Sequence, residues 1–293
     1  MKLPSQIARF MSFCRTHFLA ILVLAMTNAA AGPLRAQTID GAEILSGTAI
    51  EGGLIIARTN PANRILLDDN AIEIAENGVF VIGFHRESDV PVSVRIIAPD
   101  GNMMTSNLTP RQRDYNIQRI DGLNQTMVTP PANVLARIKA DGKAVSAARE
   151  QETPLGDFWR GFDWPARGQI SGVYGSQRIL NGKPRQPHYG IDIAAPRGTP
   201  VRAPASGKVM LVKDLYFSGW TVVIAHGLGV NSSFLHLDQV DVKAGMMIKR
   251  GDLIGTIGAT GRATGPHLDW RIDWQGRRID PGLLVSPMPN PAS

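Results

Sequence analysis

The stretch Gly261-Arg-Ala-Thr-Gly-Pro-His267-Leu-Asp269-Trp270 decides the fold of the C-terminal half of the chain. Its glycines and proline interrupt regular structure, and the residues from His267 onward alternate between polar and apolar, as in a strand. His267 and Asp269 therefore share one face of the predicted strand, with Cα atoms about 6.6 Å apart. Such a pair can bind a metal together, or divide metal binding from proton transfer. Taken alone, such a pair more often belongs to an ordinary solvated strand face.

A second pair of the same residue types stands far upstream, in His188-Tyr-Gly-Ile-Asp192. In a straight strand these two side chains would lie roughly 13 Å apart, too far for one metal with ligands about 2 Å away. Pro187 and Gly190 disfavour a helix. We therefore expect a bend at Gly190 that folds His188 over the start of a strand carrying Asp192. These two residues and one of the downstream pair would then bind a metal and leave a fourth position for water.

The first 36 residues have the layout of a secretory signal peptide. Basic residues precede an apolar run from Phe18 to Met26, and small residues follow it. The run has nine residues, whereas a membrane-spanning helix needs about 20. We expect cleavage after Ala31 or Ala36 and export to the periplasm or cell envelope. An uncleaved N-terminal anchor is the alternative.

Composition excludes several classes of function. The chain has 293 residues, of which 43% are apolar, enough for two globular domains. Removing residues 1–36 takes away four basic residues and no acidic ones, so the formal charge falls from +6 to +2. The sequence therefore predicts no nucleic-acid binding. The single cysteine, Cys14, lies in the removed segment, so an exported protein has neither disulfides nor thiolate metal ligands.

A small β-rich domain is predicted over residues 37–120. Short runs of strand character alternate with turn signals there, which predicts a β-sandwich, similar to an immunoglobulin fold. No residue of this domain specifies chemistry, and His85 is expected at the surface. The domain is a candidate for docking to an envelope protein or to the cell wall, or for a spacer. The four strands predicted in this domain cover residues 54–57, 64–67, 79–82 and 92–97.

Residues 121–157 are predicted to form a linker with a helix.

Residues 158–293 show a mainly β pattern without helical periodicity. Short strands and frequent glycines predict a compact antiparallel sheet or barrel. Four of the five histidines that follow residue 36 lie in this region. Because any metal must be held by histidines and carboxylates, this clustering favours a metal site here. The strand patterns cover 201–212, 219–226, 230–236 and 251–257.

Four motifs follow one another in this region. They are His188-x-x-x-Asp192 with Ala-Pro-Arg-Gly-Thr-Pro-Val, Phe234-Leu-His236-Leu, Gly251-Asp-x-Ile-Gly, and Thr260-Gly-x-x-Thr-Gly-Pro-His267-Leu. In this order they resemble the lysostaphin/LytM-type zinc endopeptidases, which cut peptide cross-links in bacterial peptidoglycan. The resemblance covers about residues 168–284 and implies a LytM-like domain of the duplicated hybrid motif, or barrel-sandwich, type.

The resemblance implies a role for each site residue. His188 and Asp192 correspond to zinc ligands, and His236 and His267 to catalytic histidines. The family's closing motif is His-x-His, whose second histidine is the third zinc ligand, and Asp269 stands at that position. Aspartate binds zinc at about 2.0 to 2.2 Å, so Asp269 is the expected third ligand. A metal held by two carboxylates and one imidazole withdraws less charge from its bound water than a metal held by two imidazoles and one carboxylate. The Lewis acidity of the metal is then lower, or a harder metal is preferred.

The implied function is an exported, zinc-dependent endopeptidase that acts on the stem peptides of peptidoglycan. Zinc would polarise the scissile carbonyl, while His236 and His267 transfer protons or stabilise the oxyanion. His226 matches a family position without a catalytic role, which predicts a structural histidine. The alternative is a catalytically inactive LytM-like regulator that binds the cell wall and activates another hydrolase. A module that only binds peptidoglycan is a third hypothesis.

Overall fold

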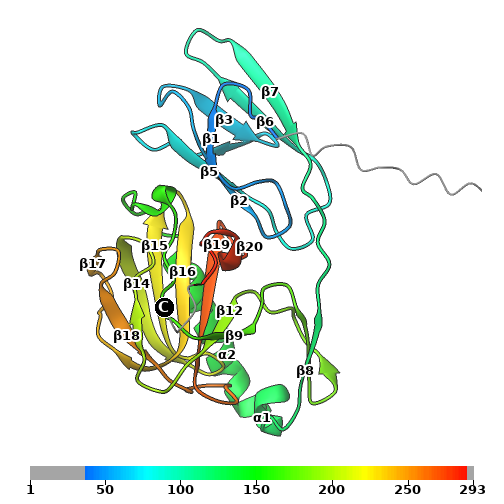
Figure 1. Cartoon of the computed structure of the whole chain (residues 1–293), viewed down its shortest axis with the longest axis vertical. Helices are drawn as coiled ribbons and strands as arrows, with labels where there is room; N and C mark the ends of the chain where they lie inside the picture. The colour runs from blue at the N-terminus through cyan, green and yellow to red at the C-terminus, as the bar shows by residue number, and fades with distance from the viewer. Residues whose placement is uncertain (1–36, 289–293) are drawn as a thin grey trace, which may run out of the picture. The chain divides into compact units, whose positions relative to one another are not determined.

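The computed structural model describes residues 37–288, which belong to one compact unit. The predicted signal peptide lies outside the described residues. The described chain is mostly β-strand, paired almost throughout in antiparallel sheets, with few helices (Figure 1). The predicted fold class is therefore confirmed. Within residues 37–288, none of the helices combines the length and the apolar character that a membrane crossing requires.

The N-terminal half contains two antiparallel sheets. One has the strand order β1-β2-β5 and the other β4-β3-β6-β7. Their inward side chains, among them Ile55, Ile65, Phe80 and Ile96, are fully buried in a shared core. All four strand runs predicted for this half are confirmed. The strands are β1 (Glu43–Ser46), β2 (Leu54–Arg58), β3 (Arg64–Leu67), β4 (Asn70–Ile72), β5 (Val79–Gly83), β6 (Val92–Ile97) and β7 (Met103–Leu108).

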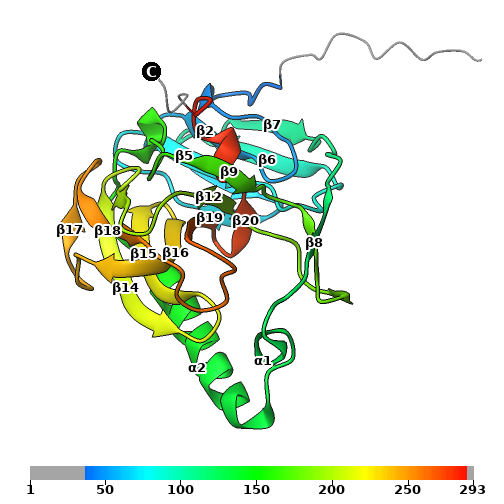
Figure 2. The same cartoon turned by 60° about the horizontal axis from the view of Figure 1, so that its bottom comes forward.

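A ten-stranded sheet forms the C-terminal half (Figure 2). Its main path runs β17-β14-β15-β16-β19-β12-β9, and β13, β18 and β20 pair at its margins. The strands are β9 (Gln169–Gly172), β12 (Ile191–Ala194), β13 (Pro200–Arg202), β14 (Gly207–Leu215), β15 (Gly219–Gly227), β16 (Val230–Val240), β17 (Met247–Ile248), β18 (Leu253–Ile257), β19 (His267–Trp274) and β20 (Arg277–Ile279). The pattern predicted over 201–212 is two strands, because Pro204 interrupts it and β13 pairs with β18.

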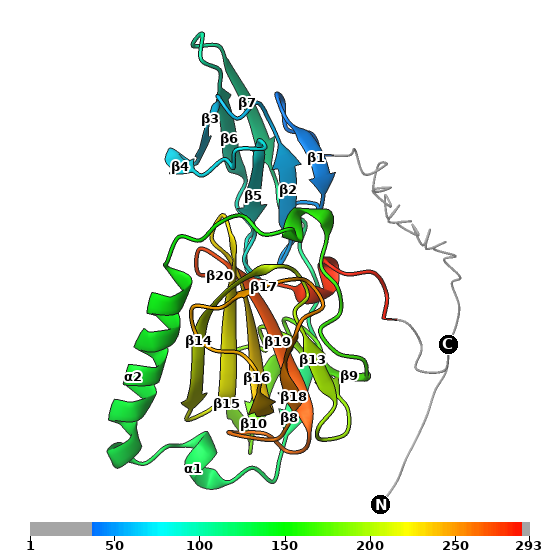
Figure 3. The same cartoon turned by 90° about the vertical axis from the view of Figure 1, so that its left-hand side faces the viewer.

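The segment between the two halves is itself part of the packing. β8 (Ile117–Ile120) pairs in parallel with β10 (Gln177–Leu180), which pairs in turn with β11 (Lys183–Pro184). α1 (Gln125–Val128) and α2 (Ala132–Arg149) follow. α2 packs along β14 and β15 (Figure 3), so the helix predicted in the linker lies against the C-terminal sheet.

β19 shows the alternation that the sequence predicts. One face carries His267, Asp269 and Arg271, and the other enters the core. Because the apolar face is enclosed by packed side chains, the polar face is held in a fixed register on the neighbouring strands. The core-facing residues, each at most 1% exposed, are Leu268, Trp270, Ile272 and Trp274.

His226 lies in the core at the end of β15. One ring nitrogen is 2.9 Å from the Ser206 carbonyl oxygen and the other 2.8 Å from the Ser232 hydroxyl. Burial lowers the pKa of His226 to about 4, so the ring is neutral near pH 7. These contacts agree with the predicted structural role.

Candidate active site and metal centre

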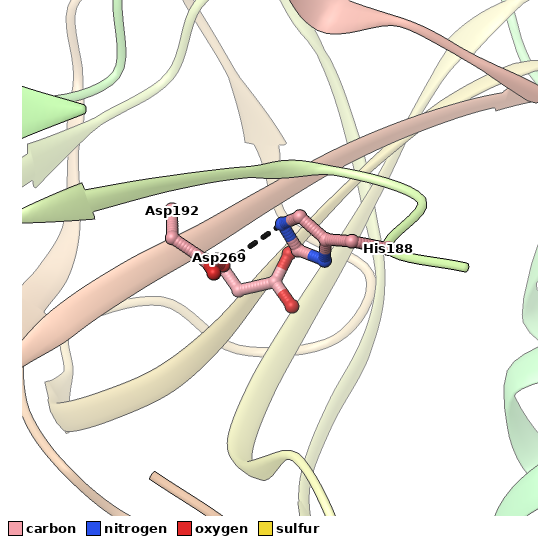
Figure 4. Close-up of side chains that lie close together, drawn as sticks. All are labelled: His188, Asp192 and Asp269. Carbon is pink, nitrogen blue, oxygen red and sulfur yellow. Dashed lines mark ion pairs between the residues drawn. The ribbon is translucent and has the colours of Figure 1, made fainter. Parts of the chain in front are cut away.

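The predicted bend at Gly190 is present. The backbone bends at Gly190, and β12 begins at the next residue, Ile191. The His188 backbone is held there, since its N–H donates to the Ser176 carbonyl (2.8 Å) and its own carbonyl accepts from Gly175 N–H (2.7 Å). As a result, His188 Nε2 lies 3.0 Å from Asp192 Oδ1 (Figure 4).

The third predicted ligand joins this pair through strand register. Asp192 on β12 is the direct antiparallel partner of Asp269 on β19. One ligand atom from each of His188, Asp192 and Asp269 lies within 4.8 Å of the other two (Figure 4). All three side chains are buried. The structure thus brings together the three residues that the sequence analysis proposed as metal ligands.

The unsatisfied atoms of this cluster fit a cation. Among the described residues, His188 Nδ1 has no hydrogen-bond partner, and His188 Nε2 and Asp192 Oδ1 face each other at 3.0 Å without forming a well-aligned hydrogen bond. A buried polar atom without a partner costs about 1 to 3 kcal/mol. A divalent metal bound between imidazole and carboxylate would satisfy these atoms, and histidine with carboxylates is a donor set that zinc accepts.

Two arginines that the sequence analysis did not predict hold the carboxylates. Arg178 Nη2 donates to Asp192 Oδ2 at 2.6 Å. Arg271 Nε donates to both oxygens of Asp269, at 3.0 and 3.1 Å, and its Nη2 donates to Oδ2 at 2.5 Å. The signal for Arg271 was present in the sequence, because a residue two positions after Asp269 shares its strand face.

These arginines keep the carboxylates ionised. Burial and the neighbouring charge of Asp269 act to raise the pKa of Asp192, but His188 and Arg178 outweigh them and hold it below its usual value. Burial acts in the same direction on Asp269, and Arg271, His188 and Arg178 hold its pKa well below its ordinary value. Both groups are therefore anionic at neutral pH, as metal ligands must be.

The two predicted catalytic histidines lie together beside this cluster. The ring centroids of His236 and His267 are 4.7 Å apart. His236 Nδ1 is 2.7 Å from the Thr260 carbonyl, and His267 Nδ1 is 2.9 Å from the Gly265 carbonyl. Since a carbonyl only accepts, each Nδ1 carries the hydrogen and each Nε2 keeps its lone pair. His267 Nε2 lies 4.0 Å from Asp192 Oδ1, on the side of the metal ligands.

His236 is also distinctive in its backbone and environment. Its φ of 64° lies in the left-handed region, which residues other than glycine seldom adopt and which is frequent at functional sites. Its N–H donates to the Ser218 carbonyl at 2.8 Å, which fixes that conformation. Burial lowers the pKa of His236 to about 4, so its ring is a neutral proton acceptor near pH 7.

A cavity of about 1010 Å³ opens beside His236. It lies between α2, which contributes Val145 and Arg149, and the sheet, which contributes Leu235, His236 and Arg271. Arg149 Nε lies 2.8 Å from Asp273 Oδ1 on β19, so the end of α2 is tied to the sheet face that carries the site. The cavity is large enough for several residues of an extended peptide.

The N-terminal half reaches the surroundings of the site. His85, which was predicted at the surface, is partly exposed, and its ring lies 5.8 Å from that of Tyr189, the residue after His188. Arg86 Nε donates to the Gly175 carbonyl at 2.9 Å. Contacts between residues so far apart in sequence leave no periodic signal, which is why the sequence analysis missed them.

Replacement of Gly190 by alanine tests the close packing of β12 against β19. A Cβ at this position would lie 2.5 Å from Asp269 Oδ1 and 2.6 Å from the Trp270 carbonyl oxygen. We expect a loss of about 1 to 3 kcal/mol in the free energy of unfolding and a weakened metal site. Urea unfolding and metal titration measure both. Gly142→Ala in α2, where a Cβ meets nothing within 4 Å, is the matched control and should leave both unchanged or raise stability.

Comparison with known proteins places the site in a family. Residues 186–281 match the model of peptidase family M23. The chain is 43% identical over 94 residues to peptidoglycan DD-endopeptidase ShyB of Vibrio cholerae, covering 32% of this chain and 22% of that protein. It is 34% identical over 172 residues to a Haemophilus influenzae protein named as an uncharacterized metalloprotease, covering 55% of this chain and 36% of that protein.

A solved structure extends the similarity beyond the matched domain. A Pseudomonas aeruginosa protein assigned to peptidase M23 superposes with a TM-score of 0.65 at 29% identity, covering 82% of this chain and 96% of that one. The likeness therefore includes residues that precede the matched domain. By contrast, the chain spans less than two fifths of the length of the two curated relatives.

Proposed function

We propose that this chain, whose residues 186–281 match peptidase family M23, is an exported zinc-dependent endopeptidase that hydrolyses peptide cross-links of bacterial peptidoglycan. One observation carries the proposal: a buried cluster of His188, Asp192 and Asp269 lies next to the paired rings of His236 and His267. The name of the Vibrio cholerae relative supports peptidoglycan as the substrate.

The residues divide the chemistry between them. Zinc held by His188, Asp192 and Asp269 would supply the Lewis acidity that polarises a scissile carbonyl. His236 and His267 present Nε2 lone pairs toward the same space, so one can accept a proton from the attacking water and the other can stabilise the oxyanion or return a proton to the leaving amine. Their fixed Nδ1 contacts keep both rings oriented for these transfers.

The cavity beside His236 is the proposed binding region for the stem peptide. Arg178 and Arg271 line it, so its surface near the ligands is rich in hydrogen-bond donors. Donors of this kind suit the carboxylates and carbonyls of a peptide. We further propose that the protein acts in the periplasm or cell envelope, and that its N-terminal half contacts an envelope protein there.

The test is metal analysis and digestion with protein expressed from Gln37. About one zinc per chain and new products from purified cross-linked muropeptides are expected. Retention of muropeptides without cleavage would instead favour the wall-binding regulator, and the absence of both would contradict any direct action on peptidoglycan. A folded protein that remains metal-free at micromolar zinc would contradict the zinc centre.

A further inference from the structure

Asp269 brings a charge to a buried position where a histidine ligand would be neutral. Its side chain is 1% exposed, and its strand partner Asp192 carries a second carboxylate. Two carboxylates facing each other in a dry interior repel each other and lose the hydration that they would have in water. The position therefore needs a compensating group.

Arg271 provides that compensation within the same strand. Its guanidinium donates three hydrogen bonds to the two oxygens of Asp269, at 3.0, 3.1 and 2.5 Å. Arg178 Nη2 donates one hydrogen bond to Asp192 Oδ2, at 2.6 Å. Two carboxylates are thus matched by two guanidinium groups. Asp269 and Arg271 taken together add no net charge to the site, as a neutral imidazole would add none.

The contacts also fix the direction of the carboxylate. A fork of donors on both oxygens sets the plane of the Asp269 carboxylate, and β19 is locked by its buried apolar face. Gly190 leaves room at Oδ1, where a Cβ would stand only 2.5 Å away. Among the described residues, Asp269 Oδ1 accepts a hydrogen bond only from Arg271 Nε, so it keeps a lone pair for a metal. Partners that orient metal ligands in this way typically change metal affinity about 10- to 100-fold when mutated.

We infer that Arg271 is a positioning residue that turns Asp269 into the equivalent of a neutral imidazole ligand. The inference rests on the proposed function, because it assumes that Asp269 binds zinc. It explains how a carboxylate can stand at the third ligand position without the excess negative charge that the sequence alone predicts. The charge of the donor set, rather than the identity of the third ligand, is what the site preserves.

The test is a cycle of four proteins whose zinc dissociation constants are measured by competition with a chromophoric chelator. Arg271→Gln should weaken zinc binding about 10- to 100-fold, because Asp269 loses its orientation and its counter-charge. Asp269→His alone should bind at least about 10-fold more weakly than Asp269→His/Arg271→Gln, because the remaining guanidinium repels the metal. The double variant should bind within about 3-fold of the parent, since an imidazole needs no counter-charge.

Two further variants separate charge from geometry. Arg271→Lys keeps the charge but loses the fork, so its zinc affinity should lie between those of the parent and Arg271→Gln. Arg95→Gln removes a surface arginine that pairs with Asp69 and should leave zinc affinity unchanged. If Arg271→Gln does not fold, the comparison of Asp269→His with the double variant still decides the question, because neither of them leaves a carboxylate unpaired at position 269.

Several results would overturn the inference. Tighter zinc binding by Arg271→Gln would show that Arg271 competes with the metal, and unchanged binding would show that Arg271 does not support the ligand. Equal binding by Asp269→His and the double variant would show that the guanidinium charge is irrelevant to the site. A parent protein that takes up no zinc would refute the proposed function and this inference together, whereas a zinc-binding parent with an unresponsive Arg271 would refute only the inference.

Discussion

Alanine at His236 or at His267 is expected to lower the rate of cross-link cleavage by about 10²- to 10⁴-fold. Each ring holds its Nδ1 hydrogen on a backbone carbonyl and keeps Nε2 free, which suits proton transfer rather than a structural contact. Neither residue belongs to the cluster of three ligands. Zinc content should therefore stay at about one per chain in both variants, whether measured by elemental analysis or by chelator competition.

The opposite control for this experiment is His188→Ala. It removes a ligand, so it should lose zinc and activity together, while the histidine variants lose activity alone. Loss of zinc from His236→Ala would contradict the division of roles, and so would unaltered cleavage by either histidine variant. Thermal unfolding of each protein with excess chelator separates these effects from a general loss of stability, because the metal no longer contributes to the free energy of unfolding.

The parts of the site that the sequence predicts are those fixed by local geometry. Alternation along β19 places Asp269 beside His267 on one face, because side chains two apart in a strand point the same way. The bend that joins His188 to Asp192 follows from the reach of a metal ligand compared with the length of a straight strand. Both features need only a few consecutive residues, so a single sequence is enough to predict them.

The parts that the sequence does not predict depend on contacts between distant segments. Arg178 contacts Asp192 because the folded chain places β10 beside the bend at Gly190. The spacing of these residues in the sequence does not predict this contact. α2 is another case, since the residues that tie it to the sheet are charged and resemble an ordinary solvated face. Arg149 at its end pairs with Asp273, which lies 1% exposed on β19. A buried ion pair of this kind becomes visible only once both partners are placed.

Asp269→Ala is expected to abolish stoichiometric zinc binding at micromolar metal and to reduce cleavage to background. With this carboxylate gone, His188 and Asp192 remain as two protein ligands, whereas catalytic zinc sites use three. The protein should still fold, because the Arg271 side chain is 27% exposed and its guanidinium can turn toward water. Elemental analysis, muropeptide digestion and thermal unfolding, measured on one preparation, give the three readouts.

The competing interpretation is that aspartate in place of histidine is a first step of decay, which leaves a site too weak to fill. Under that interpretation Asp269→Ala changes no metal content, and Asp269→His/Arg271→Gln creates activity that the parent lacks. The structure favours the ligand role, because Arg271 donates three hydrogen bonds that hold the Asp269 carboxylate in one orientation. A residue that had lost its function would not require this arrangement. The matched control is Asp238→Ala. Asp238 lies on β16 of the same sheet and pairs with the exposed Arg197, so this variant should retain both zinc and cleavage.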